Sequence, residues 1–449
     1  MSNEYVAHFV NMLQRNVVGS TGIVLQAQIK NRKGKLDKLA NASVEEAYKD
    51  WSKKANFDVS GRLCNREFQR LVMSCLATDG EVIIRKHRGF EHSRYMFGVE
   101  IIDSTLLDVE LNESLRNGNV VRMGVELDKY RRPVRYYFKN VDTRTQHGLS
   151  LDGRYTVVDA GEIIHCYENR FTNQTRGIPL IATALMRSGM LDGYEDAAVV
   201  AARIGASKLG WWKTPTGDQY LGDDIDEDGA IIDEAEPGVM GQVAGDAELV
   251  EWNPRYPNTD HAQFMKICLR GMAAGLNVGY NTLANDYEGV NYTSLRASAI
   301  DEREIWKLLQ DRLIEDIMQP LYDEWLEIQL GIGTLKVKGS ALPAFAADKY
   351  KQVRFQGRRW PWVDPQKDID ASIKAIDRNM TTVTRVIRER GDDPEQVWLE
   401  RKNELERMQE LGLSTQQVVD TSAESAMNDD KEDMSDESEQ DEPGGQEDA

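Results

Sequence analysis

The residues with the clearest spacing for chemistry form the first half of a calcium-binding loop. Asp224, Asp226 and Asp228 alternate along the chain and are followed by a glycine and, two residues later, an isoleucine. Calcium loops place oxygen ligands, a tight turn and an apolar side chain in this order. At the twelfth position, however, a bidentate glutamate is required, and this chain has Ala235. We therefore favour a solvated acidic loop over a calcium site and expect no cofactor.

A second polar set, Asp286, Glu288, Tyr292 and Arg296, resembles a catalytic cluster in residue type only. No combination of nucleophile, base and orienting group is present in it, so a structural loop with ion pairing is the better interpretation. The chain also lacks the phosphate loop, the nucleophile elbow, the dinucleotide-binding glycine motif and the paired-histidine zinc motif. These absences do not exclude catalysis, but they remove the commonest routes to it, and we expect a protein that is not an enzyme.

Two further sets of residues could bind partners. Lys266 and Arg270 share a helix face and could contact DNA phosphate, or they could lie on an exposed face or form salt bridges between subunits. Trp211, Trp212 and Trp252 flank an acidic segment and could anchor a partner protein, although a small buried core is slightly favoured.

The negative charge of the 449-residue chain is concentrated in two segments. The net charge is −20, of which residues 218–251 contribute −12 and residues 423–449 contribute −11, so the remaining body carries +3. The tail has no aromatic residue and is expected to be disordered. The internal segment also contains apolar pairs and is expected to form a small β-rich module. No run of about 18 apolar residues exists, so no membrane span is expected.

The elements that position these residues suggest an α+β fold. Short helical and strand patterns alternate over residues 1–175, including predicted strands at Val120–Leu127 and Val134–Phe138 around a polar turn. Helical patterns cover residues 179–207 and about 258–276, on either side of the acidic module. Together they predict a helical hairpin with the module at its tip.

The longest helical pattern, Ser294 to Leu330, follows a polar loop at 277–292. Thr293 or Ser294 is expected to cap this helix, and Pro320 is expected to kink it, because proline removes one backbone hydrogen bond and clashes with the preceding turn. Three more capped helices are expected after residue 364.

Six strings occur in the order found in one known family. They are Arg15–Gly19, Asp79-Gly80-Glu81-Val82, Asp128–Val134, Gln174–Pro179, Asn291–Arg296 and Trp360–Pro365, with a seventh likeness at Glu404–Leu413. Over about residues 10–415 the chain resembles the lambda-type portal proteins of tailed bacteriophages. It departs from the family's pattern at Arg131, where glycine is usual, and at Thr293, where serine is usual.

The resemblance implies the portal fold, with a wing, a helical stem, a β-rich clip and an α-helical crown, assembled into a ring. The implied boundaries are 1–178 for the wing, 179–207 and 258–277 for the stem helices, 208–257 for the acidic clip, 278–363 for the channel loop and the long kinked wing helix, 364–422 for the crown and 423–449 for the tail.

The resemblance also implies a function. The ring, usually of twelve subunits, would sit at one capsid vertex of the virion after assembly in the host cytoplasm, and double-stranded DNA would be packaged and ejected through it. The implied partners are the terminase large subunit, the major capsid or scaffold protein, and neck or head-completion proteins. A terminase subunit and a head–tail joining protein are the alternatives.

The implied channel loop comprises Asn285, Asp286, Tyr287, Glu288, Gly289, Asn291, Tyr292 and Arg296. Its glycine and asparagines tolerate unusual backbone angles, and no apolar stripe holds it, so a mobile segment is expected. Arg296 lies near the start of a helix, where a cation is unfavourable, and is expected to pair with Asp286 or Glu288.

Overall fold

The computed structural model describes residues 3–31, 33–142, 150–206, 210–213, 248–251, 259–360, 365–390, 392–410 and 412. The chain forms two compact units, residues 1–358 and 359–449. Asp224, Asp226, Asp228, Trp252 and the acidic tail 423–449 lie outside the described residues. None of the described helices is long and apolar enough to cross a membrane.

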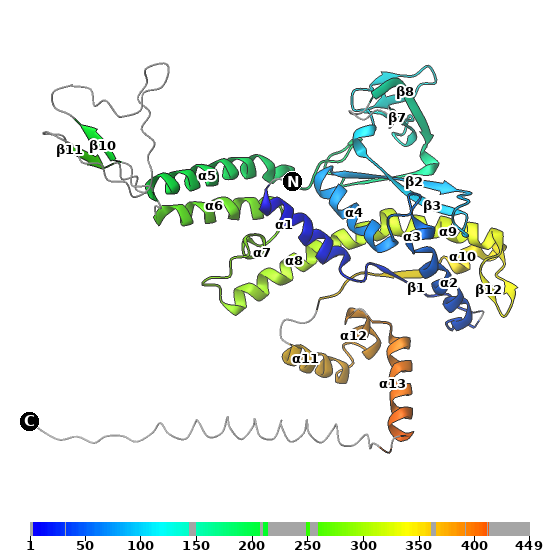
Figure 1. Ribbon diagram of the computed structural model, residues 1–449. Coiled ribbons are helices and arrows are strands. Elements are labelled where there is room, and N and C mark those ends of the chain that lie inside the picture. The colour runs from blue at the N-terminus through cyan, green and yellow to red at the C-terminus, as the bar shows by residue number, and fades with distance from the viewer. Residues whose placement is uncertain are drawn as a thin grey trace, which may run out of the picture. The chain divides into compact units, whose positions relative to one another are not determined.

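Two antiparallel sheets form the strand-rich part of the first unit (Figure 1). In the smaller sheet, β2 (Glu81–Arg88) lies between β3 (Phe97–Ile102) and β9 (Ile163–Tyr167). The larger sheet follows chain order through five strands: β4 (Glu113–Ser114), β5 (Val120–Arg122), β6 (Val125–Leu127), β7 (Pro133–Asp142) and β8 (Ser150–Asp159). Together with the helices described below, these sheets confirm the α+β class.

The prediction of one strand over Val120–Leu127 is wrong. The chain reverses at Met123 and Gly124, whose φ angles are 47° and 81°, so that β5 and β6 pair with each other. Two successive residues with positive φ are typical of the tight turns that join hairpin strands. The alternation of apolar residues continues through this turn and therefore conceals it.

The next turn places an arginine in a conformation that favours glycine. Arg131 has a φ of 64°, and Asp128 holds the turn by accepting hydrogen bonds at 2.8 Å from the backbone N–H groups of Tyr130 and Arg132. The Asp128 side chain therefore stabilises a left-handed residue that would otherwise cost roughly 1–2 kcal/mol.

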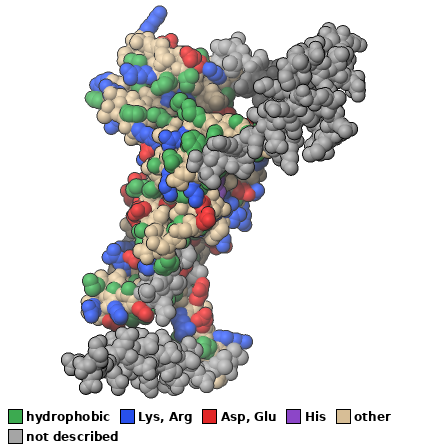
Figure 2. Space-filling model, turned by 90° about the vertical axis from the view of Figure 1, so that its left-hand side faces the viewer, with side chains coloured by type: hydrophobic (Ala, Val, Ile, Leu, Met, Phe, Trp, Pro, Cys, Tyr) green, Lys and Arg blue, Asp and Glu red, His purple; other side chains and the backbone are tan. Residues whose placement is uncertain are grey.

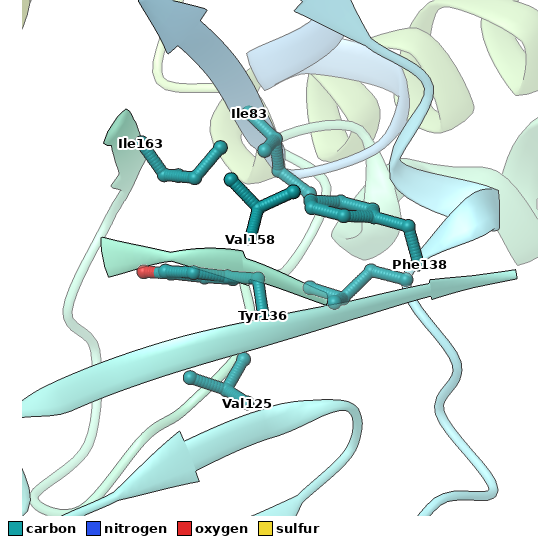
Figure 3. Close-up of a cluster of buried hydrophobic side chains, with 7 residues drawn as sticks. Ile83, Val125, Tyr136, Phe138, Val158 and Ile163 are labelled. Atoms are coloured by element: carbon teal, nitrogen blue, oxygen red, sulfur yellow. The ribbon is translucent and has the colours of Figure 1, made fainter. Parts of the chain in front are cut away.

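A buried apolar cluster joins the two sheets (Figure 3). Ile83 and Ile163 come from the smaller sheet, whereas Tyr136, Phe138 and Val158 come from the larger one, and all are nearly inaccessible to solvent. Residues that alternate along each strand thus bury one face of both sheets in a shared core.

Helices pack on the side of the unit that holds the smaller sheet and enclose a second core. The helices are α1 (Glu4–Leu13), α2 (Lys38–Trp51), α3 (Lys54–Phe57), α4 (Asn65–Thr78), α8 (Tyr292–Leu313), α9 (Gln319–Ile332) and α10 (Ala347–Tyr350). Fully buried Trp51 and Trp325 lie at the centre, and the ring of Tyr48 is 5.2 Å from that of Trp325. Segments from both ends of the unit meet here, because β1 (Val24–Ala27) pairs with β14 (Val353–Gln356).

The long helical pattern is interrupted just before Pro320. A π-helical turn, Ile314–Met318, separates α8 from α9, and Pro320 lies at the start of α9. The location agrees with the expected disturbance, since proline lacks the N–H that the preceding turn would otherwise use.

The helical hairpin expected around the acidic module consists of α5 (Ala182–Ala206) and α6 (Thr259–Gly275), which pack against each other (Figure 1). Beyond them, β10 (Gly210–Lys213) pairs antiparallel with β11 (Glu248–Glu251). The second unit contains α11 (Pro365–Asp377), α12 (Val383–Arg390) and α13 (Pro394–Glu410).

A buried ion pair connects the sheets to the start of this hairpin. Glu81 on β2 is 2% exposed and accepts hydrogen bonds from Arg176 Nε at 2.7 Å, His165 Nε2 at 3.0 Å and the Gly177 N–H at 2.8 Å. Arg176 also donates to the backbone carbonyls of Ser104, Leu107 and Met123. The guanidinium therefore joins both sheets to the segment that leads into α5.

Two glycines make this junction sterically possible. A Cβ atom on Gly177 would lie 2.1 Å from the carbonyl oxygen of Gly80, and one on Gly80 would lie 2.2 Å from the carbonyl carbon of Ile178. The backbones therefore approach more closely than any other residue type allows.

We expect acid to weaken the fold through Glu81. Burial by itself raises the pKa of Glu81, but hydrogen bonds from His165 and Arg176 outweigh it, and the pKa falls to about 2. Because this pKa is lower in the folded state, ionised Glu81 stabilises the fold above pH 4.5. The stabilisation, roughly 3 kcal/mol, is lost as pH falls from about 4.5 to 2.

Urea unfolding of wild type and of Glu81→Gln between pH 7 and 3 measures this contribution. The variant is expected to be less stable at pH 7, with the difference shrinking towards pH 3. Glu91→Gln, which removes an exposed carboxylate, is the control and should follow wild type. A difference between wild type and Glu81→Gln that does not change with pH would contradict this assignment.

Candidate functional site

The candidate loop is shorter than the polar segment suggested, because a small helix occupies part of it. The helix α7 (Tyr280–Ala284) ends at Asn285, which has a left-handed φ of 55°, and Gly289 has a φ of 69°. Asn291 then caps α8, with its Oδ1 accepting a hydrogen bond from the Ser294 N–H at 2.8 Å. The predicted cap at Thr293 or Ser294 is therefore wrong, since both residues are already helical.

Asp286 holds this loop to its surroundings. Its Oδ2 accepts a hydrogen bond from the Tyr280 hydroxyl at 2.6 Å and lies 3.4 Å from Lys266 Nζ, while Oδ1 accepts from the Glu288 N–H at 3.1 Å. The hydrogen bonds from Tyr280 and Glu288, with the charge of Lys266, lower the pKa of Asp286. The carboxylate thus stays ionised and keeps its partners near neutral pH.

The structure brings the two predicted basic residues to this same loop. Lys266 contacts Asp286, and the guanidinium of Arg270 lies over the Tyr280 ring, 5.4 Å from its centre. Both cations on α6 therefore have partners within their own chain. The sequence interpretation considered phosphate, solvent and other subunits as partners, but not this loop.

The helix that precedes the loop, α7, is held by contacts with α1 and α8. His8 of α1 lies 3.1 Å from the Thr282 carbonyl oxygen through its Nε2, and the Gly279 N–H donates to Glu302 Oε1 of α8 at 2.7 Å. A Cβ atom on Gly279 would lie 2.6 Å from Ser298 Oγ, so a larger residue here would have to displace the side chains of α8. The loop therefore projects from a well-anchored base.

The remaining loop residues are more exposed. Tyr287 and Tyr292 are about half exposed, and Glu288 lies at the surface. Of the two acidic partners expected for Arg296, Asp286 contacts Tyr280 and Lys266 instead; the pairing of Arg296 stays a prediction.

The chemistry available to this cluster is recognition of charge. Burial and the hydrogen bond to Asp286 raise the pKa of Tyr280 to about 12, so the phenol is a hydrogen-bond donor and not a base at neutral pH. Lys266 and Arg270 carry positive charge beside it. Such a cluster can hold a loop or exchange its carboxylate for a phosphate.

The tryptophans that could bind a partner belong to other secondary-structure elements than this cluster. Trp211 and Trp212 are on β10, opposite Val250 and Leu249 of β11. Their role as a partner surface stays a prediction.

Sequence reasoning missed the outward apolar residues of α5. Leu185, Met186, Met190, Val199 and Val200 are all exposed, although they belong to a long helix. The signal was present, since apolar residues occur on several sides of this helix and not in a single stripe.

We expect Asp286→Asn to loosen the loop. Loss of the ion pair with Lys266 and a weaker hydrogen bond from Tyr280 should increase amide hydrogen exchange at residues 285–291 about fivefold. Glu288→Gln makes the same change of charge two residues away, at the loop surface, and should have little effect. Equal exchange in the two variants would show that Asp286 does not hold the loop.

Comparisons with known proteins show which family this chain resembles. Residues 1–310 match the family described as phage portal protein, lambda family. The chain is 32% identical over 419 residues to the probable portal protein of Halomonas phage phiHAP-1, covering 92% of this chain and 79% of that protein. It is 23% identical over 284 residues to portal protein B of Escherichia phage lambda, covering 56% of this chain and 51% of that protein.

Two solved structures have more distant similarity. A chain from the neck of an empty GTA particle, computed with C6 symmetry, has a TM-score of 0.40 at 11% identity, with 79% of this chain and 81% of that chain covered. A chain from the virion of a native gene transfer agent particle has a TM-score of 0.39 at 10% identity, with 84% and 86% covered. The family match and the Halomonas phage relative confirm the resemblance read from the six strings: this chain belongs to the lambda family of phage portal proteins.

Proposed function

We propose that this chain is the subunit of a closed ring at one vertex of a phage capsid, through which double-stranded DNA is packaged and ejected. The ring is a structural conduit in the virion and has no catalytic step of its own. Membership of the portal family supports this proposal. The observation that carries it is the apolar surface that the α5–α6 hairpin leaves uncovered.

This surface lies on several sides of the hairpin. Ala184, Leu191 and Ala198 recur every seven residues of α5 and are buried. Met186 and Met190 are 78% and 71% exposed, and Phe264 and Ile267 of α6 are also exposed. In one view of the molecule, exposed hydrophobic side chains lie among the charged ones (Figure 2).

Exposed apolar side chains at this density favour contact with another protein surface. A hairpin that is apolar on opposite sides suits a closed cyclic assembly, in which each subunit contacts two neighbours through different surfaces. We therefore assign α5 and α6 to the stem. The resemblance to the portal family implies a ring of about twelve subunits.

The same proposal assigns the remaining parts. Residues 1–178 and the later segments that pack on them form the wing, residues 208–257 the clip and 364–422 the crown. The loop at 285–291 faces the channel with Lys266 and Arg270 beside it, so that passing phosphates compete with Asp286 for the two cations. The acidic clip and its tryptophans dock the terminase large subunit and later the neck proteins, and the wing meets the capsid or scaffold.

Ring formation through the stem has a direct test. Met186→Glu with Met190→Glu places two charges on one side of the stem, where burial against a neighbour is unfavourable, and should leave monomers with a normal circular dichroism spectrum. Phe345→Glu alters a 94% exposed apolar residue elsewhere and should still form rings. Analytical ultracentrifugation distinguishes the species. Wild type that stays monomeric over a wide concentration range, or a double variant that still forms rings, would contradict the proposal.

Deleting Asp286–Val290 tests the channel loop. The deletion removes the loop but keeps α7 and the Asn291 cap, so rings should form while packaged DNA is retained poorly. Arg296→Ala, within α8, should weaken the ring or the wing instead. Quantifying DNA in filled heads, with electron microscopy of the purified rings, separates these effects. Normal retention by the deletion variant would remove the loop from the channel, and failure to form rings would make it a structural segment.

A further inference from the structure

A groove at the far end of the first unit from the α5–α6 hairpin has no role in the proposed conduit. It has a volume of about 1020 Å³ and lies between α2, the end of α9 and the small hairpin of β12 (Lys336–Val337) and β13 (Ser340–Ala341) (Figure 1). This volume is at the upper end of the range for ligand pockets, roughly 300–1,000 Å³.

The lining of the groove is partly apolar, and its residues on α2 follow one helical stripe. Leu39, Ala42, Glu46 and Asp50 line the groove at spacings of three or four residues, and Lys53 lines it just beyond the end of the helix. A stripe over the whole of this 14-residue helix is about 21 Å long. Leu39 is 52% exposed, and Ile332 of α9, which also lines the groove, is 48% exposed. Leu39, Ala42 and Ile332 therefore give the groove an exposed apolar patch beside the charged residues of α2.

The rim is positively charged in a chain whose net charge is −20. Five cations line it, against the carboxylates of Glu46 and Asp50: Lys49, Lys53, Arg94, Lys336 and Lys338. Asp50 already accepts from Lys53 at 2.7 Å, from Arg94 at 2.5 Å and from the Tyr95 hydroxyl at 3.0 Å. Lys49, Lys336 and Lys338 form no ion pair with any residue that the structure describes. Unneutralised positive charge thus remains at the rim.

The hairpin that carries two of these lysines is held firmly. Leu335 is buried, its carbonyl oxygen accepts from the Leu342 N–H at 2.9 Å, and Ser43 Oγ of α2 donates to the Lys336 carbonyl at 3.0 Å. Lys338 has a φ of 50°, a conformation unfavourable for a residue with a side chain. The fold therefore maintains a strained turn that places Lys338 at the groove.

We propose that this groove binds an acidic amphipathic helix of another protein. Aliphatic side chains on one face of that helix pack on the apolar patch that contains Leu39 and Ile332, and its carboxylates face the unpaired lysines. A nucleic acid fits the groove less well, because its phosphates gain nothing from the exposed side chains of Leu39 and Ile332, on which the aliphatic face of a helix can pack.

A designed peptide tests the site on the full-length protein. The probe is a fluorescein-labelled helix of about 14 residues, matched to α2, with leucine at i, i+3, i+4 and i+7 spacing and glutamate elsewhere. A second peptide has serine in place of leucine, and a short DNA duplex is the third probe. Binding is measured by fluorescence anisotropy.

The leucine peptide should bind wild type at least tenfold more tightly than the serine peptide. Lys336→Glu with Lys338→Glu, and separately Leu39→Ser, should each weaken its binding about tenfold, whereas Lys129→Glu, on an exposed turn elsewhere, should not. Equal binding of the two peptides, or no effect of the groove variants, would overturn the proposal. DNA binding that is lost in the lysine variant would also overturn it. Tighter binding of a peptide with the sequence of residues 413–449 would overturn it as well, because this chain's own tail would then be the occupant.

Discussion

The ion pair between Glu81 and Arg176 is the interaction on which the arrangement of the first unit depends. Taking two charges out of water is costly, and their attraction offsets this only when every hydrogen-bonding position is used. Glu81 accepts from a guanidinium, an imidazole and a backbone N–H, and Arg176 donates to three carbonyls besides. Separating the two groups would leave a buried charge without a partner. Both groups are therefore satisfied only when these segments keep their observed placement.

That placement sets the direction of the stem hairpin. Gly177 follows the arginine directly and packs on Gly80, and α5 begins at Ala182. The returning helix, α6, then leads to α7 and the loop that Asp286 fastens to Lys266 and Tyr280. A constraint between two sheets is therefore transmitted along a pair of helices to the candidate channel loop. In the proposed ring, neighbouring subunits would restrain the same hairpin through its exposed methionines.

Negative and positive charges of this chain lie in different segments and on different surfaces. The acidic residues are concentrated in 218–251 and 423–449, which leaves a body of +3. Within that body, Lys266 and Arg270 have partners in the chain, whereas three lysines around the α2 groove have none among the described residues. Cations already paired suit a conduit from which DNA must be released, and unpaired cations beside an exposed apolar patch suit a lasting protein contact.

Local sequence determined much of the outline. The α+β class, the helices around the acidic module, the disturbance before Pro320 and the three helices after residue 364 follow from periodicity, caps and proline chemistry, which act within a few residues. The strings around Gly80 and Gly177 identified the family, but their spacing alone did not reveal that the two glycines touch. The hairpin hidden in residues 120–127 was missed because its alternating pattern is the same with or without a turn.

Tertiary structure decided the contacts between distant segments. Glu81 and Arg176 are 95 residues apart, and β1 pairs with β14 from the other end of the first unit. Asp286 was assigned to a mobile loop because its partner, Lys266, lies on a different helix. The sequence showed apolar residues on several sides of α5, but only its packing against α6 decided which of them stay exposed. The physical reason is common to all four: burial and ion pairing depend on which surfaces meet in space, and the sequence records only which residues are available to meet.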